Sequence, residues 1–325
     1  SVLTAIWKDL FGRAHIERDA NFFELGGDSL LFVEAGWQIR KQLQVSLTVA
    51  DLFKFPTIAL LTEHLAPASS TQEAAASPTT NRHTADVQEQ ETALIPLKAG
   101  DGHGTPLFLV HPAGGSVFFY RELADLLPAD ATVYGFQARG IERDAEPRRS
   151  VEEMASCYLE ELRAAHPRGP YALGGASFGG LVALEMAQRL RADGETVELL
   201  VVFDSPGPGQ VPPDLGDVDI TEFSSIAPDP AFARQLAEVY RANMEALRAY
   251  RPRPYPGPVL YFLAEQRREG IDPLRPDLAW EPLAPGGLTV HRVPGDHVTM
   301  LAAQNVPAIS RVVSAHLESA EAKKR

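Results

Sequence analysis

The stretch GGASFGG, residues 174–180, surrounds one serine, Ser177, with residues that have almost no side chain. The preceding YALGG is typical of a buried strand and the following FGGLVALEMAQRL of a helix, so Ser177 stands at the turn between them. So sharp a turn strains the backbone and brings strand and helix together, which explains Gly175 and Gly179 on either side. We expect the hydroxyl to project above the strand ends, beside helix N–H groups that favour negative charge. The alternative is a glycine-rich turn in which Ser177 caps the helix.

Around this turn, strand-length apolar runs alternate with helical patterns, which indicates a mostly parallel sheet covered by helices on both faces. Residues 205–256 interrupt the alternation, because they are first rich in proline and then helical. An insertion of about 50 residues is far longer than the usual connection between two strands, so we expect it to form a lid. Besides the strand before Ser177, the expected strands are PLFLVH (106–111), ATVYGFQ (131–137), ELLVVFD (198–204), GPVLYFLAE (257–265) and LTVHRVPG (288–295).

A serine hydroxyl becomes a nucleophile when a base takes its proton, and histidine is the usual base. His297, in PGDHVTM, follows the last expected strand, so it lies on a loop at the same sheet edge as Ser177. His297 is therefore the predicted base. Other histidines lie ahead of the first expected strand, within a strand, or in or beside helices: His15, His64, His83, His103, His166, His291 and His316.

The base needs a carboxylate that orients its ring. Asp204 ends the strand ELLVVFD, and the chain order serine, aspartate, histidine is that of hydrolases. Two alternatives stay open: Glu265 ends the next strand, and Asp296 is adjacent to His297. We favour Asp204, and Asp296 is the weaker alternative because an adjacent residue rarely bends back onto its neighbour's ring.

Acyl transfer develops a negative oxygen that backbone N–H groups must stabilise, and losing one such donor costs about 3 kcal/mol. Phe178, the residue after the serine, supplies one N–H group. The loop HPAGG follows the strand PLFLVH, and we expect Ala113 in it to supply the other, because Gly114 and Gly115 let the backbone turn freely. An ordinary glycine-rich turn is the alternative interpretation of this loop.

The composition excludes several classes of function. A net charge of −13 argues against binding to a nucleic-acid backbone, which needs a basic surface. The single cysteine, Cys157, rules out an internal disulfide, and we interpret it as a small core residue of a helix. We expect no metal site. Because the chain has no run of 18 apolar residues and residues 1–30 lack a signal-peptide pattern, we expect a cytoplasmic protein without a membrane partner.

A chain of 325 residues suggests two domains, and its composition marks the boundary between them. Residues 66–93 contain no aromatic residue and are dominated by Ala, Ser, Thr, Gln and Glu, so they cannot bury enough apolar area to offset their ordering entropy. We expect a flexible linker there, between a small helical bundle at 1–65 and a larger domain at 94–325. Because residue 1 already lies in a helical pattern, we expect the sequence to be a piece of a longer multidomain enzyme.

A second serine, Ser29, follows two glycines in NFFELGGDSLL (21–31). It begins a helix, so a helix cap is the plain interpretation, and no histidine lies close enough in the sequence to activate it. LGGDSL, preceded by DANFFE and followed by DLFKFPTIALLTEHL, is similar to a peptidyl carrier domain of nonribosomal peptide synthetases over essentially all of residues 1–65. The resemblance implies that Ser29 carries 4′-phosphopantetheine, whose thiol holds the acyl chain as a thioester. It also implies that Asp28 belongs to the surface read by a phosphopantetheinyl transferase.

Residues 94–325 resemble the type I thioesterase domain at the end of such synthetases, a relative of the α/β hydrolases. The similar segments run from PLFLVHPAGG through GGASFGG, VVFDSP and VYRANMEALRAYRPRPYPGPVLYFLAE to GDHVTML. The resemblance implies an α/β-hydrolase domain with Ser177, Asp204 and His297 as its triad and a helical lid near 221–250. One residue departs from the pattern: Ala176 stands where many relatives carry a bulky aromatic residue or a histidine, which leaves the shape of the acyl pocket open.

Together the two resemblances predict release of a finished acyl or peptidyl chain from the arm on Ser29 through an ester on Ser177, in nonribosomal peptide or hybrid polyketide biosynthesis. Hydrolysis, macrocyclisation and transfer to an acceptor all stay open. The expected partners are a phosphopantetheinyl transferase, upstream condensation and adenylation domains, and the thioester substrate. A flexible linker of about 28 residues spans about 30 Å, which lets the carrier visit and leave the larger domain. The alternatives are an editing thioesterase, a free esterase or lipase, and a carrier module whose C-terminal domain only scaffolds partners.

Overall fold

The structure, a computed structural model of the 325-residue chain, describes residues 2–22, 25, 29–45, 47, 51–52, 55–65, 92–141, 145–210, 230–268, 272–273 and 275–322. The linker expected at 66–93 lies outside the described residues except for its last two positions. Residues 211–229 of the expected lid also lie outside them.

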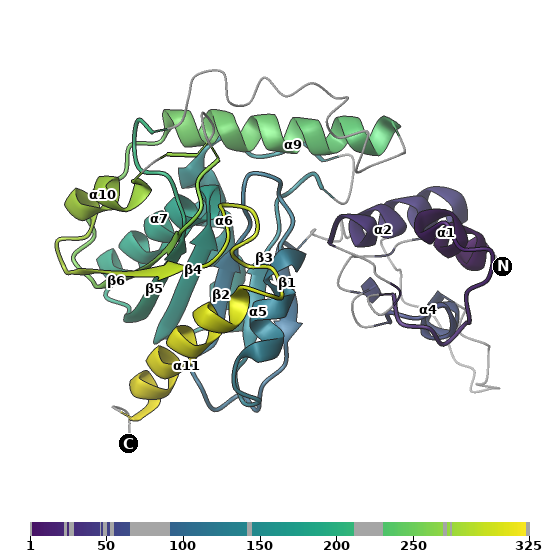
Figure 1. Cartoon of the computed structure of the whole chain (residues 1–325), viewed down its shortest axis with the longest axis horizontal. Coiled ribbons are helices and arrows are strands. Elements are labelled where there is room, and N and C mark those ends of the chain that lie inside the picture. The colour runs from purple at the N-terminus through teal and green to yellow at the C-terminus, as the bar shows by residue number, and fades with distance from the viewer. Residues whose placement is uncertain are drawn as a thin grey trace, which may run out of the picture.

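Helices form the described part of the N-terminal region, as the sequence predicted. They are α1 (Val2–Phe11), α2 (Ser29–Leu43) and α4 (Ile58–Leu65). α1 buries Leu3, Ile6 and Trp7, which recur at the three- and four-residue spacing of one helix face. Trp7 meets Phe22 edge-on, with ring centroids 5.4 Å apart, among the buried apolar side chains of these helices. Figure 1 shows how the three helices are arranged.

A seven-stranded sheet organises the rest of the chain, with strand order β1-β3-β2-β4-β5-β6-β7. β1 pairs with β3 antiparallel, and the five other pairings are parallel. The carboxyl ends of six strands therefore meet at one edge of the sheet. The strands are β1 (Leu94–Lys98), β2 (Leu107–Val110), β3 (Val133–Phe136), β4 (Tyr171–Ala176), β5 (Val197–Phe203), β6 (Val259–Ala264) and β7 (Leu288–Val293).

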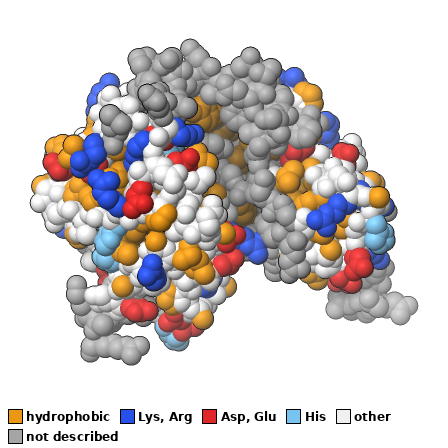
Figure 2. Space-filling view, viewed as in Figure 1, with side chains coloured by type: hydrophobic (Ala, Val, Ile, Leu, Met, Phe, Trp, Pro, Cys, Tyr) orange, Lys and Arg blue, Asp and Glu red, His pale blue; other side chains and the backbone are white. Residues whose placement is uncertain are grey.

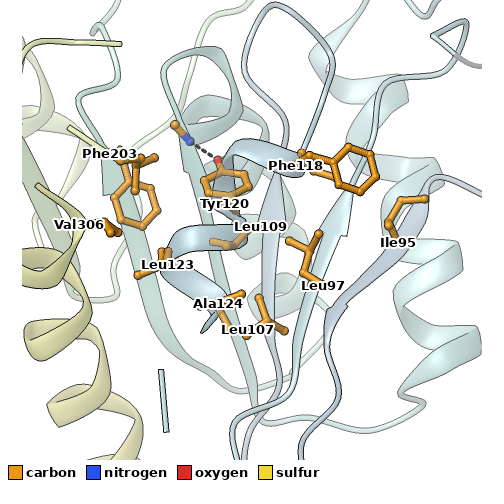
Figure 3. Close-up of a cluster of buried hydrophobic side chains, with 14 of the residues drawn as sticks. Ile95, Leu97, Leu107, Leu109, Phe118, Tyr120, Leu123, Ala124, Phe203 and Val306 are labelled. Carbon is orange, nitrogen blue, oxygen red and sulfur yellow. Dashed lines mark hydrogen bonds between the residues drawn. The ribbon is translucent and has the colours of Figure 1, made fainter. Parts of the chain in front are cut away.

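Helices cover both faces of this sheet, which is why β2, β4 and β6 are buried at every position. Side chains alternate between the two cores: Leu107 of β2 belongs to one and Phe108 to the other. The core of Leu107 lies toward α5 (Arg121–Leu126) and α11 (Val306–Ala322), whereas the core of Phe108 lies toward α6 (Val151–Ala165) and α7 (Phe178–Ala192). Figure 1 shows this layering, and Figure 3 shows the first core at close range.

The long helix α9 (Pro230–Ala249) belongs to the expected lid and lies across one end of the sheet in Figure 1. Its Asn243 side chain donates a hydrogen bond of 2.8 Å to the carbonyl of Ala113, in the loop that follows β2. α9 therefore covers the carboxyl edge of the sheet. Among the described residues, the remaining short helices are η1 (Phe118–Tyr120), α10 (Pro276–Trp280) and η2 (Glu281–Leu283).

The structure confirms the α/β class and each strand expected from the sequence, and it adds one strand. β1, with the sequence LIPLK, was not predicted, because Pro96 interrupts a short segment that is buried at alternate positions only. Cys157 lies half-buried in α6, where burial raises the pKa of its thiol and so makes it less reactive. Within the described helices, none is long and apolar enough to cross a membrane. Basic and acidic side chains are intermingled on the face shown in Figure 2.

Candidate active site

The candidate site lies at the carboxyl edge of the sheet, where the strand order changes direction. β2 has β3 on one side and β4 on the other, so the chain leaving β2 and the chain leaving β4 diverge at this edge, which is where open parallel sheets usually bind ligands. Ser177 follows β4, Asp204 follows β5 and His297 lies in the loop after β7. The parallel sheet thus brings three side chains, separated by as many as 120 positions, to one edge.

Ser177 occupies the strained turn that its glycine neighbours predict. Its φ of 53° and ψ of −124° lie in a region that residues with a side chain rarely adopt. A Cβ atom on Gly175 would lie 2.2 Å from the backbone carbon of Gly179, and one on Gly179 would lie 2.3 Å from the carbonyl oxygen of Val110. Strand β4, helix α7 and the end of β2 therefore touch through backbone, which only glycine at these two positions allows.

A buried tyrosine supports this turn from below. The Tyr120 hydroxyl donates a hydrogen bond of 2.7 Å to the carbonyl of Val110 and accepts one of 2.6 Å from the N–H group of Ala176, the residue before the serine. The pairing of β2 with β4 ends at Val110, which lies opposite Gly175. The N–H group of Ala176, the next residue of β4, therefore donates to the Tyr120 hydroxyl and not to β2. Figure 3 shows the Tyr120 ring among apolar side chains, with the hydrogen bond drawn to a backbone nitrogen. The sequence pattern did not single out Tyr120, since an aromatic residue in an FFY run is typical of any core.

The imidazole of His297 connects the hydroxyl to a carboxylate. Its Nε2 lies 3.0 Å from Oγ of Ser177, and its Nδ1 lies 2.8 Å from Oδ2 of Asp204. An ionised carboxylate only accepts hydrogen bonds, so Nδ1 carries the proton and Nε2 is left to accept the serine hydroxyl. In this tautomer the ring is oriented to remove the hydroxyl proton.

The two alternative carboxylates do not fill this role in the structure. Oδ1 of Asp296 accepts the N–H groups of Val298 and Thr299 and the Thr299 hydroxyl, at 2.7–3.0 Å, and so caps its own turn. Glu265 follows β6, but both nitrogens of the imidazole are already engaged by Ser177 and Asp204. Asp204 and Glu265 each stand at the end of a strand, so the sequence alone does not decide between them. The folded structure does, because the imidazole contacts Asp204.

Asp204 is buried and strongly held. Its side chain is 1% exposed, and besides His297 it accepts the N–H group of Ala264 at 3.0 Å and both ends of the Arg267 guanidinium at 2.7 and 2.5 Å. Burial by itself raises the pKa of this carboxyl, but the hydrogen bonds from His297 and Arg267 outweigh it and lower the pKa below its ordinary value. The carboxylate therefore stays ionised beside the imidazole.

The loop after β2 is held in a defined orientation. The Pro112 carbonyl accepts the N–H group of Gly115 at 2.9 Å and lies 2.8 Å from Nδ1 of His111. In a trans peptide the following N–H group points the opposite way, so these two contacts fix the direction of the Ala113 N–H group. The carbonyl oxygens at the start of this loop pack against the first turn of α7, where the N–H group of Phe178, the first residue, has no acceptor within the helix itself. The two predicted donors thus belong to segments in contact.

His111 was not among the residues that the sequence singled out. It is fully buried, and because its Nδ1 must donate to the Pro112 carbonyl, its Nε2 accepts the hydroxyl of Tyr158 at 2.8 Å. Burial lowers the pKa of His111 to about 4, so the ring stays neutral at ordinary pH. Its ring centroid lies 5.8 Å from that of Phe178. His111 therefore links the loop after β2 to the residue after the serine.

The other predicted site lies in the N-terminal helices. Ser29 is the first residue of α2, which has 15 residues, whereas Asp28 lies outside the described residues. A helix N-terminus stabilises an anion, so this position suits a serine that carries a phosphodiester. Across the described ranges, no group of three or more His, Cys, Asp and Glu side chains could hold a metal ion.

Comparisons with known proteins agree with this geometry. The family model of the thioesterase domain matches residues 105–317, and the model of the phosphopantetheine attachment site matches residues 1–65. Malpibaldin synthetase of Mortierella alpina is 30% identical over 97% of this chain and 6% of its own length. The dimodular nonribosomal peptide synthase of Bacillus subtilis (strain 168) is 30% identical over 98% of this chain and 14% of its own length. The chain thus spans a small part of these relatives.

Solved structures are similar as well. A holo four-domain nonribosomal peptide synthetase bound to AMP and glycine matches 97% of this chain and 26% of that chain, with a TM-score of 0.64 and 28% identity. A covalent complex of the NocB thioesterase domain with a fluorophosphonate nocardicin G analog matches 65% of this chain and 95% of that chain, with a TM-score of 0.55 and 32% identity. The larger match covers both the N-terminal helices and the sheet.

Proposed function

The chain belongs to the thioesterase domain family and carries a phosphopantetheine attachment site in its first 65 residues, and we propose that it releases an acyl or peptidyl chain from its own carrier domain in nonribosomal peptide biosynthesis. One observation carries the proposal: a continuous hydrogen-bond chain runs from the Ser177 hydroxyl through His297 to Asp204. The carrier domain is assigned to residues 1–65, the linker to 66–93 and the thioesterase domain to 94–325, with a lid at about 205–256.

Ser29 is assigned as the attachment residue for 4′-phosphopantetheine. At the first position of α2, Ser29 would hold the phosphodiester at the positive end of a helix. The group supplies a thiol that holds the acyl chain as a thioester. A phosphopantetheinyl transferase is the partner that attaches it, and upstream condensation and adenylation domains are the partners that build the acyl chain.

In the first half of the reaction, Oγ of Ser177 attacks the thioester carbonyl while Nε2 of His297 takes the hydroxyl proton. Asp204 holds the ring and stabilises the imidazolium that forms. The N–H groups of Ala113 and Phe178 bind the oxyanion of the tetrahedral intermediate. His297 then returns the proton to the departing sulfur as the carbon–sulfur bond breaks, and the acyl chain remains as an ester on Ser177.

In the second half, the same groups act on an incoming nucleophile. His297 removes a proton from water, or from an amine or hydroxyl group, and the attack on the ester regenerates the Ser177 hydroxyl. Water gives a linear acid, a nucleophile within the acyl chain gives a macrocycle, and an external nucleophile gives a transfer product. Helix α9, which belongs to the lid, touches the loop of Ala113 through Asn243.

The test uses the full chain with Ser29 loaded by a phosphopantetheinyl transferase and an acyl-coenzyme A. Intact-mass spectrometry then follows loss of the acyl group with time. We expect the wild type to lose it, the Ser177→Ala and His297→Ala variants to retain it, and Ser29→Ala to show no mass gain at loading. Equal release rates in the wild type and Ser177→Ala would reject the proposed mechanism, and loading of Ser29→Ala would reject the attachment residue.

A further inference from the structure

We propose that Arg267 is a positioning residue for the Asp204–His297 pair: it orients the carboxylate and, through its fixed positive charge, keeps that carboxylate ionised in more acidic solution. The inference rests on the proposed function. Arg267 lies in the loop after β6, three residues beyond the end of the strand. Neither β6 nor this loop supplies a member of the predicted triad.

The contact is a two-pronged ion pair. Nη1 of Arg267 donates to Oδ2 of Asp204 at 2.7 Å, and Nη2 donates to Oδ1 at 2.5 Å. Nη2 also donates to the Ala264 carbonyl at 2.9 Å, which anchors the guanidinium to the end of β6. The side chains of Arg267 and Asp204 are only 13% and 1% exposed, so water competes little with these bonds. Two parallel bonds between planar groups fix orientation as well as distance.

This arrangement sets which way the carboxylate faces. Oδ1 accepts the N–H group of Ala264 and one arm of Arg267, while Oδ2 accepts the other arm and Nδ1 of His297 at 2.8 Å. Each oxygen therefore has two donors, and rotation of the carboxylate would break bonds on both. Arg267 thus keeps Oδ2 directed at the imidazole without touching the ring itself.

The charge of Arg267 has a second effect, whose sign follows from electrostatics. Burial favours the neutral form of Asp204, but the hydrogen bonds from His297 and Arg267 hold the pKa of this carboxyl below its ordinary value. Without the guanidinium, burial raises the pKa of Asp204. A protonated Asp204 no longer holds the imidazole as an ionised acceptor, so the acid limb of the kcat/KM profile moves to higher pH when the charge of Arg267 is removed.

The other charged groups near the pair stay in place when Arg267 is changed. Arg268 is bound to Asp272 at 2.7 Å, and the Asp272 side chain is 3% exposed. Asp296, on the loop of His297, is bound to Thr299. Tyr261 of β6 is a further titratable neighbour among the described residues, and its hydroxyl donates to the Ser205 carbonyl at 2.7 Å. None of these groups replaces the guanidinium on Asp204.

The experiment compares Arg267→Gln with Arg267→Lys in the full chain. Both variants lose the two-pronged contact, but only glutamine loses the charge. The measurement is kcat/KM against pH for hydrolysis of an acyl N-acetylcysteamine thioester, with urea unfolding as a check of folding. We expect lower plateaus in both variants, an acid limb about one pH unit higher in Arg267→Gln, and a limb at the wild-type position in Arg267→Lys. Arg292→Met, a charge removal on the exposed side of β7, should leave the limb in place.

The outcomes separate this inference from the proposed function. Turnover that does not depend on Ser177 would reject the proposed function itself. Ser177-dependent turnover with the same acid limb in Arg267→Gln and the wild type would overturn the inference alone. Failure of both variants to fold would also overturn it, because Arg267 would then be required for folding and not for positioning the carboxylate during the reaction.

Discussion

Replacing Tyr120 with phenylalanine tests how the turn at Ser177 is supported. The substitution keeps the ring packed in its core and removes one oxygen atom, which bonds the Val110 carbonyl at 2.7 Å and the Ala176 N–H group at 2.6 Å. Two hydrogen bonds are lost, and a donor and an acceptor are left buried without partners. Leaving a buried donor or acceptor without its partner costs about 1–3 kcal/mol, so we expect Tyr120→Phe, which leaves two such groups, to lower the free energy of unfolding by about 2–6 kcal/mol.

Urea titration followed by far-ultraviolet circular dichroism measures this loss in the full chain. Tyr134→Phe is the matched control, because Tyr134 is half-buried and its ring stacks on Phe108, a contact that phenylalanine keeps. We expect the control to stay within about 0.5 kcal/mol of the wild type. On the proposed function, Tyr120→Phe should also lower kcat about tenfold, because the residue before the nucleophile is less firmly placed. A loss of stability no larger than that of the control would refute the role given to the hydroxyl.

Three further perturbations test other parts of the site. Gly179→Ala places a Cβ atom 2.3 Å from a backbone oxygen of β2, so we expect a loss of more than about 3 kcal/mol in urea unfolding, whereas Gly114→Ala, which meets open space, should lose less than about 1 kcal/mol. Asn243→Leu removes the 2.8 Å hydrogen bond from α9 to the Ala113 carbonyl. We expect steady-state assays to show a kcat about tenfold lower with KM little changed. An unaltered kcat would mean that this contact does not position the oxyanion donor. The pKa of His111 is lowered from 6.5 to about 4, so its buried neutral ring contributes stability that is complete above pH 6.5 and is lost as the pH falls toward 4. Unfolding free energies measured across that range should fall by about 3 kcal/mol more in the wild type than in His111→Gln, and parallel curves would contradict the assignment.

The sequence indicated Ser177, Asp204 and His297 because the residues around each of them mark the end of a strand. Ser177, Asp204 and His297 each follow an apolar strand, and a parallel sheet brings such strand ends to one edge. The choice between Asp204 and Glu265 was left open, since each ends a strand. It depends on which carboxylate reaches Nδ1, and that distance exists only in the folded chain.

The residues that the sequence did not reveal act through distant partners. Tyr120 bonds a group 56 positions away, Arg267 one 63 positions away and Asn243 one 130 positions away. Nothing near these residues in the chain distinguishes an arginine that holds a buried carboxylate from one that faces solvent. Strand β1 was missed for a related reason, because its pairing with β3 and not its own short sequence makes it a strand.

The most direct test of the central claim is to locate the acyl group during a single turnover. The chain is loaded at Ser29 with an acyl group, quenched in acid at successive times and digested, and the peptides that contain Ser29 and Ser177 are measured by mass spectrometry. We expect the acyl group to leave the Ser29 peptide, to pass through the Ser177 peptide as an ester, and to stay on Ser29 in the Ser177→Ala variant. Release of the acyl group at the same rate with no ester ever found on Ser177 would contradict the account.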